Sequence, residues 1–204
     1  MMLLEGIKDT LYMTLTSTLI GYVIGLPMGI LLTVTDKDGI HPNTAVYKVL
    51  DVIANLIRSV PFLILLIVLI PFTRFLIGRS YGPTATIVPL VIAAAPYIAR
   101  MVESSLKEVD AGVIEAARSM GASNFTIVTK VMLVEARTSL IVGATISLGT
   151  ILGYSAMAGT VGGGGLGDIA IRYGYTRWQT DIMIVTVIFC LLYTSPSPRD
   201  GATS

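Results

Sequence analysis

Charged residues divide the chain into five long apolar stretches. Residues 10–35, 59–73, 80–99, 138–167 and 182–198 contain no Asp, Glu, Lys or Arg. A charge at the centre of a bilayer costs at least about 2.5–3.5 kcal/mol, so uncharged stretches of this length are typical of membrane-spanning helices. The pattern predicts an all-α membrane protein with five transmembrane helices, centred near Gly21, Leu66, Leu90, Ser147 and Ile188.

The second stretch is the shortest of the five. A helix over residues 59–73 is about 22 Å long, against a hydrocarbon core of about 30 Å. Arg58 and Arg74 can extend their charged groups towards the membrane surface, and residues 50–57 add apolar length. We therefore count this stretch as a span, with a buried helix of a soluble protein as the alternative for this segment alone.

Composition supports a membrane protein. Of 204 residues, 53% are apolar and 13% are charged, whereas soluble domains average roughly 45–50% and about 25%. The mean hydropathy is +0.79. A net charge of +1 gives no basic surface for nucleic acid, and the single cysteine, Cys190, excludes a disulfide framework and a cysteine-based zinc site. We expect no metal, and we exclude a soluble enzyme and a disordered chain.

The distribution of Lys and Arg predicts the orientation. With five spans, one side carries Lys37, Lys48, Arg58, Arg100, Lys107, Arg118, Lys130, Arg137 and Arg199, and the other carries Lys8, Arg74, Arg79, Arg172 and Arg177. Cytoplasmic loops are enriched in basic residues, so this bias favours a cytoplasmic middle loop and an external N-terminus. The first stretch is also too long for a cleavable signal peptide, so we expect it to remain as a span.

Small residues and prolines interrupt the spans. Gly21, Gly25 and Gly29 recur every four residues and predict a groove that another helix can approach closely. Prolines weaken a helix locally because they lack a backbone N–H, and they fall in three of the spans at Pro27, Pro61, Pro71, Pro89 and Pro96. Ordinary helix packing is the alternative for each of these positions.

The long charged segment, residues 101–137, predicts a helical loop that projects from the membrane. Gly121 permits a sharp turn with positive φ, and Ser123 or Asn124 can cap a second short helix. Two short helices that meet at Gly121 would present a rigid surface to a cytoplasmic partner. An amphipathic connector at the membrane interface is the alternative.

The run of Glu115, Ala116, Ala117, Arg118 and Gly121 resembles the EAA signature of ABC importer permeases. In that family the loop docks into a cleft of the ATP-hydrolysing subunit, so the resemblance implies a cytoplasmic coupling loop. The family usually ends the motif with Leu-Pro, whereas Leu133 is followed here by Val134. This departure would soften the second bend while the signature residues remain in place.

Further segments resemble the permease family of bacterial methionine importers. They are residues 62–74, 95–103, 153–159, 162–168 and 173–175, and the likeness extends to about Leu192. The resemblance implies a homodimer in the bacterial cytoplasmic (inner) membrane, with two cytoplasmic ATP-binding subunits and an external substrate-binding lipoprotein. It also implies that the chain carries no cofactor, since ATP is bound by the partner subunit.

The glycine-rich segment comprises Gly162, Gly163, Gly164, Gly165 and Gly167. It does not fit a phosphate-binding loop, because no Lys-Ser or Lys-Thr pair follows its last glycine and no strand precedes it. A flexible external turn is one interpretation. The other is a close-approach surface that serves as an external gate or contacts the binding protein.

The chain shows no catalytic constellation. The single histidine, His41, has no second ligand or nucleophile nearby, and we expect Glu103, Glu108, Asp110 and Glu115 to form a solvated helix face. Transport sites lie near the bilayer midplane at helix breaks. The candidate substrate pathway in the fourth span, with core packing as the alternative for each residue, comprises Ser147, Tyr154, Ser155 and Met157.

The chain divides into two parts in this interpretation. Residues 1–192 form the permease transmembrane domain, and residues 193–204 form an atypical tail in which two prolines interrupt the last apolar stretch. We expect the tail to be unrelated sequence appended to a truncated span.

The leading functional hypothesis is a permease subunit that moves methionine by alternating access, driven by ATP hydrolysis on a partner. A permease for another amino acid or a quaternary amine is an alternative in the same class. A small-solute channel that needs no ATPase is a third hypothesis, and the loop signature argues against it. A membrane-embedded enzyme is disfavoured because catalytic groups are missing.

Overall fold

The computed structural model describes residues 2–194, with side chains as far as Leu191, and within these residues every regular element is helical. The first half of the chain comprises α1 Met2–Thr35, α2 Thr44–Ser59, α3 Phe62–Val68, α4 Ile70–Ile77 and α5 Pro83–Lys107. The second half comprises α6 Ala111–Ser119, α7 Asn124–Thr126, the π-helix η1 Ile127–Met132, α8 Leu133–Glu135, α9 Arg137–Ala158, the 3-10 turn η2 Gly159–Val161, α10 Gly165–Ile169, the π-helix η3 Ala170–Tyr175 and α11 Thr180–Thr194. The predicted all-α class is confirmed.

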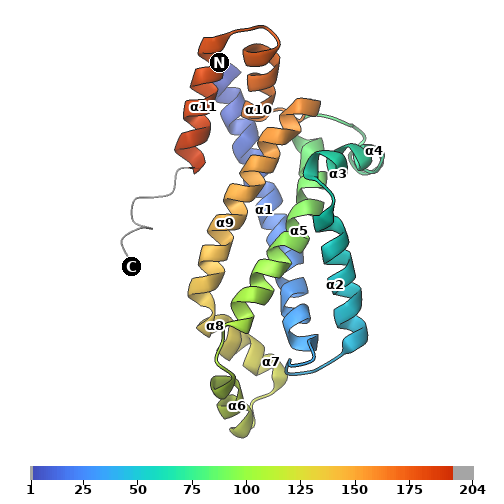
Figure 1. Ribbon diagram of the computed structural model, residues 1–204, viewed down its shortest axis with the longest axis vertical. Coiled ribbons are helices and arrows are strands. Elements are labelled where there is room, and N and C mark those ends of the chain that lie inside the picture. The colour runs from blue at the N-terminus through green and yellow to red at the C-terminus, as the bar shows by residue number, and fades with distance from the viewer. Residues whose placement is uncertain (1, 195–204) are drawn as a thin grey trace.

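The helices α1, α5 and α9 form the centre of the bundle (Figure 1). Their contact surface buries Met13, Leu90, Ile98 and Ile151. The glycine groove predicted in α1 is confirmed, because a Cβ atom at Gly25 would lie 2.7 Å from the carbonyl oxygen of Ala95 in α5. Small residues therefore bring these two helix backbones close together.

The structure does not confirm the predicted number of five membrane-spanning helices. Three helical segments are long and apolar enough to cross a bilayer, Met2–Thr35, Pro83–Lys107 and Arg137–Tyr175. If α2 and α3 are counted together as one bent span, the number is four. The apolar helix Thr180–Leu191 is shorter than these spans. On length and composition, the described residues therefore hold three or four candidate spans.

The span predicted around Leu66 is not one straight helix. The axes of α2 and α3 meet at an angle of 101°, at a break between Ser59 and Phe62. Val60 is extended, with φ −86° and ψ 125°. The ring of Pro61 disfavours helical geometry for the residue before it, so α2 ends here and the chain turns into α3.

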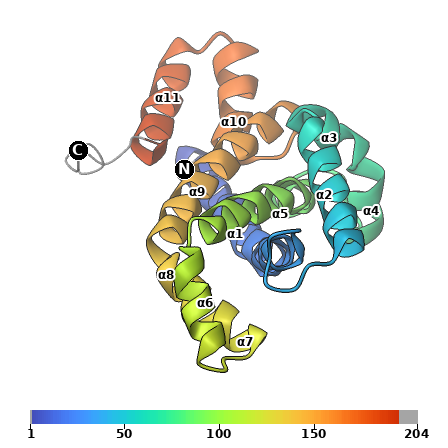
Figure 2. The same ribbon diagram turned by 60° about the horizontal axis from the view of Figure 1, so that its bottom comes forward.

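The two ends of the bundle carry different features. The N-terminal end of α1 lies beside α10 and α11, whereas α6 and α7 lie at the opposite end (Figure 1). Seen from that end, α6 and α7 project away from the other helices (Figure 2). The atypical tail was predicted to begin at residue 193. Its residues from 195 onward lie outside the described part of the chain.

Candidate functional site

The projecting segment is a bent arm made of α6, the turn at Gly121 and α7. The Asp110 carboxylate accepts a hydrogen bond from Gly112 N over 2.7 Å and caps α6. The Ser123 hydroxyl accepts one from Thr126 N over 3.2 Å and caps α7. Between the two helices Gly121 has φ +82°, a conformation that other residues adopt at a cost of roughly 1–2 kcal/mol. The predicted bend and the predicted cap at Ser123 are confirmed.

The signature residues occupy two faces of α6. Glu115, Ala116 and Arg118 are exposed, whereas Ala117 is buried against the side of η1. The Arg118 guanidinium donates to the carbonyl oxygen of Ile40 over 3.1 Å, which ties the arm to the loop after α1. The arm is therefore anchored through Ala117 and Arg118, whereas Glu115 and Ala116 are open to solvent.

Two apolar side chains at the tip of the arm were not singled out from the sequence. Met120 is 82% exposed and Phe125 is 78% exposed, on either side of Gly121. Both side chains are therefore accessible at the tip of the arm. The signal available in the sequence was the placement of large apolar residues next to turn and cap residues.

A charged cluster lies where the arm leaves the bundle. The Glu103 carboxylate is 2.7 Å from Arg100 Nη1 and 2.8 Å from Lys107 Nζ, and Lys107 Nζ is also 2.7 Å from the Asp36 carboxylate. Arg100 also pairs with Asp51 of α2. The cluster therefore joins α1, α2 and α5 at the base of the arm.

The position of Glu103 in this cluster shows that one prediction was wrong. The cluster also changes the pKa of one carboxyl group. Glu103 was expected on a solvated face, but it is only 5% exposed, because α5 continues past Ala99 to Lys107 and carries Glu103 into the bundle. The hydrogen bond from Lys107 lowers the pKa of the Asp36 carboxyl below its usual value, and burial opposes this shift. Asp36 is therefore held as a carboxylate.

The four candidate pathway residues of α9 lie in different surroundings. Ser147 and Ser155 are buried, and their hydroxyls donate to carbonyl oxygens of α9 itself, Gly143 O over 2.8 Å and Leu152 O over 2.7 Å. Tyr154 stacks on Phe62 of α3, with ring centroids 4.5 Å apart, and lines a cavity of about 190 Å³. Met157 is 48% exposed. Among these four candidates, Tyr154 is therefore the residue that lines a cavity in the described part of the chain.

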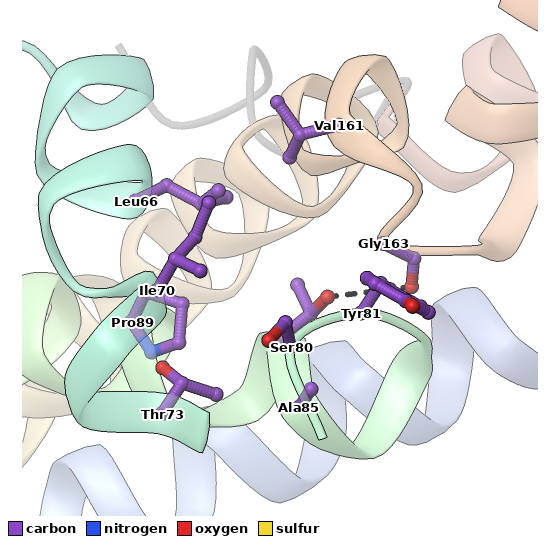
Figure 3. Close-up of a pocket in the computed structure, with 10 residues that line it drawn as sticks. Leu66, Ile70, Thr73, Ser80, Tyr81, Ala85, Pro89, Val161 and Gly163 are labelled. Carbon is purple, nitrogen blue, oxygen red and sulfur yellow. Dashed lines mark hydrogen bonds between the residues drawn. The ribbon is translucent and has the colours of Figure 1, made fainter. Parts of the chain in front are cut away.

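The glycine-rich segment packs tightly against α1 and α5. The Thr86 hydroxyl donates to Gly163 O over 3.3 Å, a bond drawn in Figure 3, and the Thr10 hydroxyl accepts from Leu166 N over 2.9 Å. Gly162, Gly164 and Gly165 have φ between +77° and +85°, and a Cβ atom at Gly167 would lie 2.1 Å from Ala156 O. Glycine is needed here for backbone shape and for close approach to neighbouring segments of the same chain.

A small cavity adjoins this turn (Figure 3). It measures about 20 Å³ and lies between Leu66, Ile70 and Thr73 on one side and Tyr81 and Gly163 on the other. A water molecule needs roughly 10–15 Å³ of such space. The buried Thr73 hydroxyl has no hydrogen-bond partner among the described residues, so a water molecule in this cavity would satisfy it.

These features together define a class of protein. Long apolar helices packed through glycines, a charged junction at one end and a rigid arm outside the bundle are the features of a helical membrane permease. The chain belongs to the family described as "Binding-protein-dependent transport system inner membrane component", whose model matches residues 21–196. It is therefore a transport component of the inner membrane and not itself an enzyme.

Curated relatives are permease proteins of one transport system. The chain is 47% identical over 191 residues to the "Probable D-methionine transport system permease protein MetI" of Vibrio cholerae, with 94% of this chain and 85% of that protein covered. It is 51% identical over 158 residues to the D-methionine transport system permease protein MetI of Escherichia coli K12, with 78% and 73% covered.

Solved structures agree with the fold. A structure of the MetNI methionine ABC transporter in an inward-facing conformation matches with a TM-score of 0.93 and 48% identity, over 95% of this chain and 89% of that chain. An amino acid ABC transporter crystallised with histidines matches with a TM-score of 0.76 at 22% identity, over 95% and 87%. The second likeness supports the fold alone.

Proposed function

We propose that this chain is the membrane-spanning permease subunit of an ABC importer that carries methionine across the cytoplasmic membrane. The observation that carries the proposal is the anchored arm with Glu115, Ala117, Arg118 and Gly121, in a chain 48% identical to a subunit of a methionine ABC transporter. Residues 1–192 form the transmembrane domain in this proposal.

The proposed assembly contains two copies of this chain, two cytoplasmic ATP-binding subunits and an external substrate-binding lipoprotein. The exposed face of α6, with Glu115, Ala116 and Arg118, docks into the ATP-binding subunit, and Met120 and Phe125 add apolar contact at the tip. The arm then lies in the cytoplasm. Because the N-terminal end of α1 lies at the opposite end of the bundle, it faces the outside.

Motion of the arm passes to the bundle through its anchors. Arg118 holds the loop after α1, and Lys107 holds Asp36 and Glu103 at the end of α5, so a displacement of α6 pulls on α1 and α5 together. ATP hydrolysis on the partner would switch the dimer between inward-open and outward-open states by this route.

The substrate pathway in this proposal follows α9. Ser147, Tyr154, Ser155 and Met157 contribute to it, with Tyr154 at the 190 Å³ cavity and Met157 one turn further along the helix. The turn with Gly162, Gly163, Gly164, Gly165 and Gly167 serves as the external gate or as the contact for the binding lipoprotein. Its place at the end of the bundle opposite the arm supports this assignment.

The test is uptake of labelled methionine by the reconstituted complex with and without ATP. We expect ATP-dependent uptake, and we expect Gly121→Pro and Glu115→Lys to lower substrate-stimulated ATP hydrolysis. Gly143→Ala is a matched control, since a Cβ atom there meets Met101 at an ordinary 3.6 Å. Wild-type stimulation in both arm variants would refute the docking assignment. Uptake without ATP would favour a channel. Uptake of another amino acid or a quaternary amine in place of methionine would show that methionine is not the cargo.

A further inference from the structure

Arg58 is a cation without a counter-ion at the end of α2, beside the middle of α5 and not at the membrane face where the five-span prediction placed it. It is exposed in the last turn of α2 and has no ion-pair partner among the described residues. It lines the same cavity as Tyr97, which lies in the middle of the membrane-crossing helix α5. Charged side chains are costly at such depth, and those that occur there mark the paths of ligands and ions.

The cavity beside Arg58 combines a flat aromatic wall with few polar groups. The parallel rings of Phe62 and Tyr154, at an interplanar angle of 9°, form the wall between α3 and α9. The Tyr97 hydroxyl also lines the cavity, and its oxygen lies 3.4 Å from the Thr150 hydroxyl, whose hydrogen has the closer acceptor Ile146 O at 2.9 Å. Small-molecule sites commonly combine aromatic and aliphatic walls with a small number of placed polar groups, and this cavity has both.

The size and position of the cavity also suit a small ligand. Its volume of about 190 Å³ is more than ten times the roughly 10–15 Å³ that one water molecule needs. It lies at the break between α2 and α3, and discontinuous helices commonly form the substrate sites of membrane transporters. The last turn of α2 ends there, and the carbonyl end of a helix attracts a positive group such as an ammonium.

We propose that this cavity is a binding subsite for an amino acid inside the permease, in which Arg58 binds the α-carboxylate and the Phe62–Tyr154 wall packs against an apolar side chain. A guanidinium binds a carboxylate through two parallel hydrogen bonds, which fixes the orientation of the ligand. A thioether is polarizable and packs well on aromatic rings, so methionine suits the wall. This inference rests on the proposed function, because it takes the imported amino acid as the ligand.

The experiment measures equilibrium binding of radiolabelled L-methionine to the purified permease–ATPase complex without the binding lipoprotein. We expect Arg58→Gln to weaken binding about tenfold or more, Arg58→Lys to weaken it less, and Tyr97→Phe to weaken it a few-fold. Arg74→Gln is the matched control, since Arg74 is an exposed arginine outside the described cavities. The amount of complex that elutes at the wild-type volume shows that each variant assembles.

Methioninol, which lacks the carboxylate, tests the role of the charge directly. It should displace the label from the wild type about tenfold less well than methionine, and this difference should disappear in Arg58→Gln. Equal binding by wild type and Arg58→Gln, or displacement of the label by anionic lipid as effectively as by methionine, would overturn the subsite.

Failure of the proposed cargo is distinguishable from failure of the subsite. If the wild-type complex imports methionine but does not bind it without the lipoprotein, the subsite is refuted and the function stands. If the complex imports a different amino acid, the methionine assignment fails, and the same comparison of Arg58→Gln with Arg74→Gln on that amino acid decides the subsite.

Discussion

The Lys107 ammonium lies 2.7 Å from the Asp36 carboxylate and joins the last residue of α5 to the residue that follows α1. Asp36 is only 17% exposed, and Lys107 also contacts the buried Glu103 carboxylate. Because α6 begins at Ala111, only three residues separate this junction from the arm. In the proposed mechanism, this junction passes motion of the arm to α1 and α5.

We predict that Lys107→Met lowers the stability of the complex by about 1–2 kcal/mol. The substitution removes one of the two cations that neutralise Glu103, and a buried charge that loses its partner is destabilising. The partial exposure of Lys107 reduces the cost below that of a fully buried pair. Thermal unfolding of the solubilised complex measures the effect.

The control for this prediction is Lys37→Met. Lys37 is 83% exposed and its nearest carboxylate, on Asp38, is 3.8 Å away and also exposed. Exposed pairs of this kind contribute roughly 0–1 kcal/mol, so the control should behave almost as the wild type. An equal loss of stability in both variants would show that the junction has no special energetic role.

The Asp36 carboxyl predicts a dependence of stability on pH. Its pKa is lower in the folded protein than its ordinary value of 3.8, chiefly because Lys107 hydrogen-bonds the carboxylate. A lowered pKa stabilises the folded state at pH values above the unfolded pKa, and this contribution is lost as the pH falls through the folded pKa. The stability difference between wild type and Asp36→Asn should thus be constant from pH 7 to about pH 5 and shrink below about pH 4.

The same scan with Asp38→Asn provides the comparison, since Asp38 is 84% exposed. Exposed ion pairs contribute roughly 0–1 kcal/mol, so this replacement should change the stability little. If the Asp36→Asn difference grows as the pH falls, the sign of the linkage is opposite to the one argued here.

Part of this architecture could be predicted from the sequence. Uncharged stretches locate membrane helices because the cost of burying a charge is local and large. The arm was also predictable, since a positive φ at Gly121 and a hydroxyl cap at Ser123 are local requirements of a bent helix pair. These features depend on neighbouring residues only.

Other features depend on residues far apart in the chain. Glu103 shares a helical face with other polar residues, and nothing in that pattern shows that Asp51, from another helix, pairs with Arg100 beside it. Likewise, Pro61 fits both a kinked span and a broken one. The sharp bend places Phe62 on Tyr154 of α9, a contact between residues 92 positions apart in the chain that only the fold reveals.

We predict that Gly29→Ala destabilises the protein by about 1–3 kcal/mol. A Cβ atom there would lie 2.5 Å from Ala99 O and 2.7 Å from Val102 Cβ, so α1 and α5 must move apart. Gly143→Ala is the matched control in a helix interior, because its nearest atom would be 3.6 Å away. Thermal unfolding should rank wild type and Gly143→Ala together and Gly29→Ala below them, and the reverse order would contradict the close packing.

We predict that Thr10→Val loosens the glycine-rich turn. Leu166 is the second residue of α10, where an amide has no partner within its own helix, and the Thr10 hydroxyl of α1 accepts its hydrogen bond over 2.9 Å. Valine keeps the shape of threonine but leaves this buried N–H unsatisfied, at a cost of about 1–3 kcal/mol. Amide hydrogen exchange in residues 162–169 should become faster, while Thr10→Ser should keep the protection.

Thr18→Val is the matched control for this last variant. Thr18 is a buried threonine of the same helix, and its hydroxyl donates to Thr14 O over 2.7 Å. Removal of the Thr18 hydroxyl leaves no amide without a partner, because the carbonyl of Thr14 remains within the hydrogen-bond ladder of α1. Faster exchange in the turn with Thr10→Val but not with Thr18→Val would establish that α1 holds the turn through this one hydroxyl. Equal exchange in both variants would mean that packing of the glycines alone holds it.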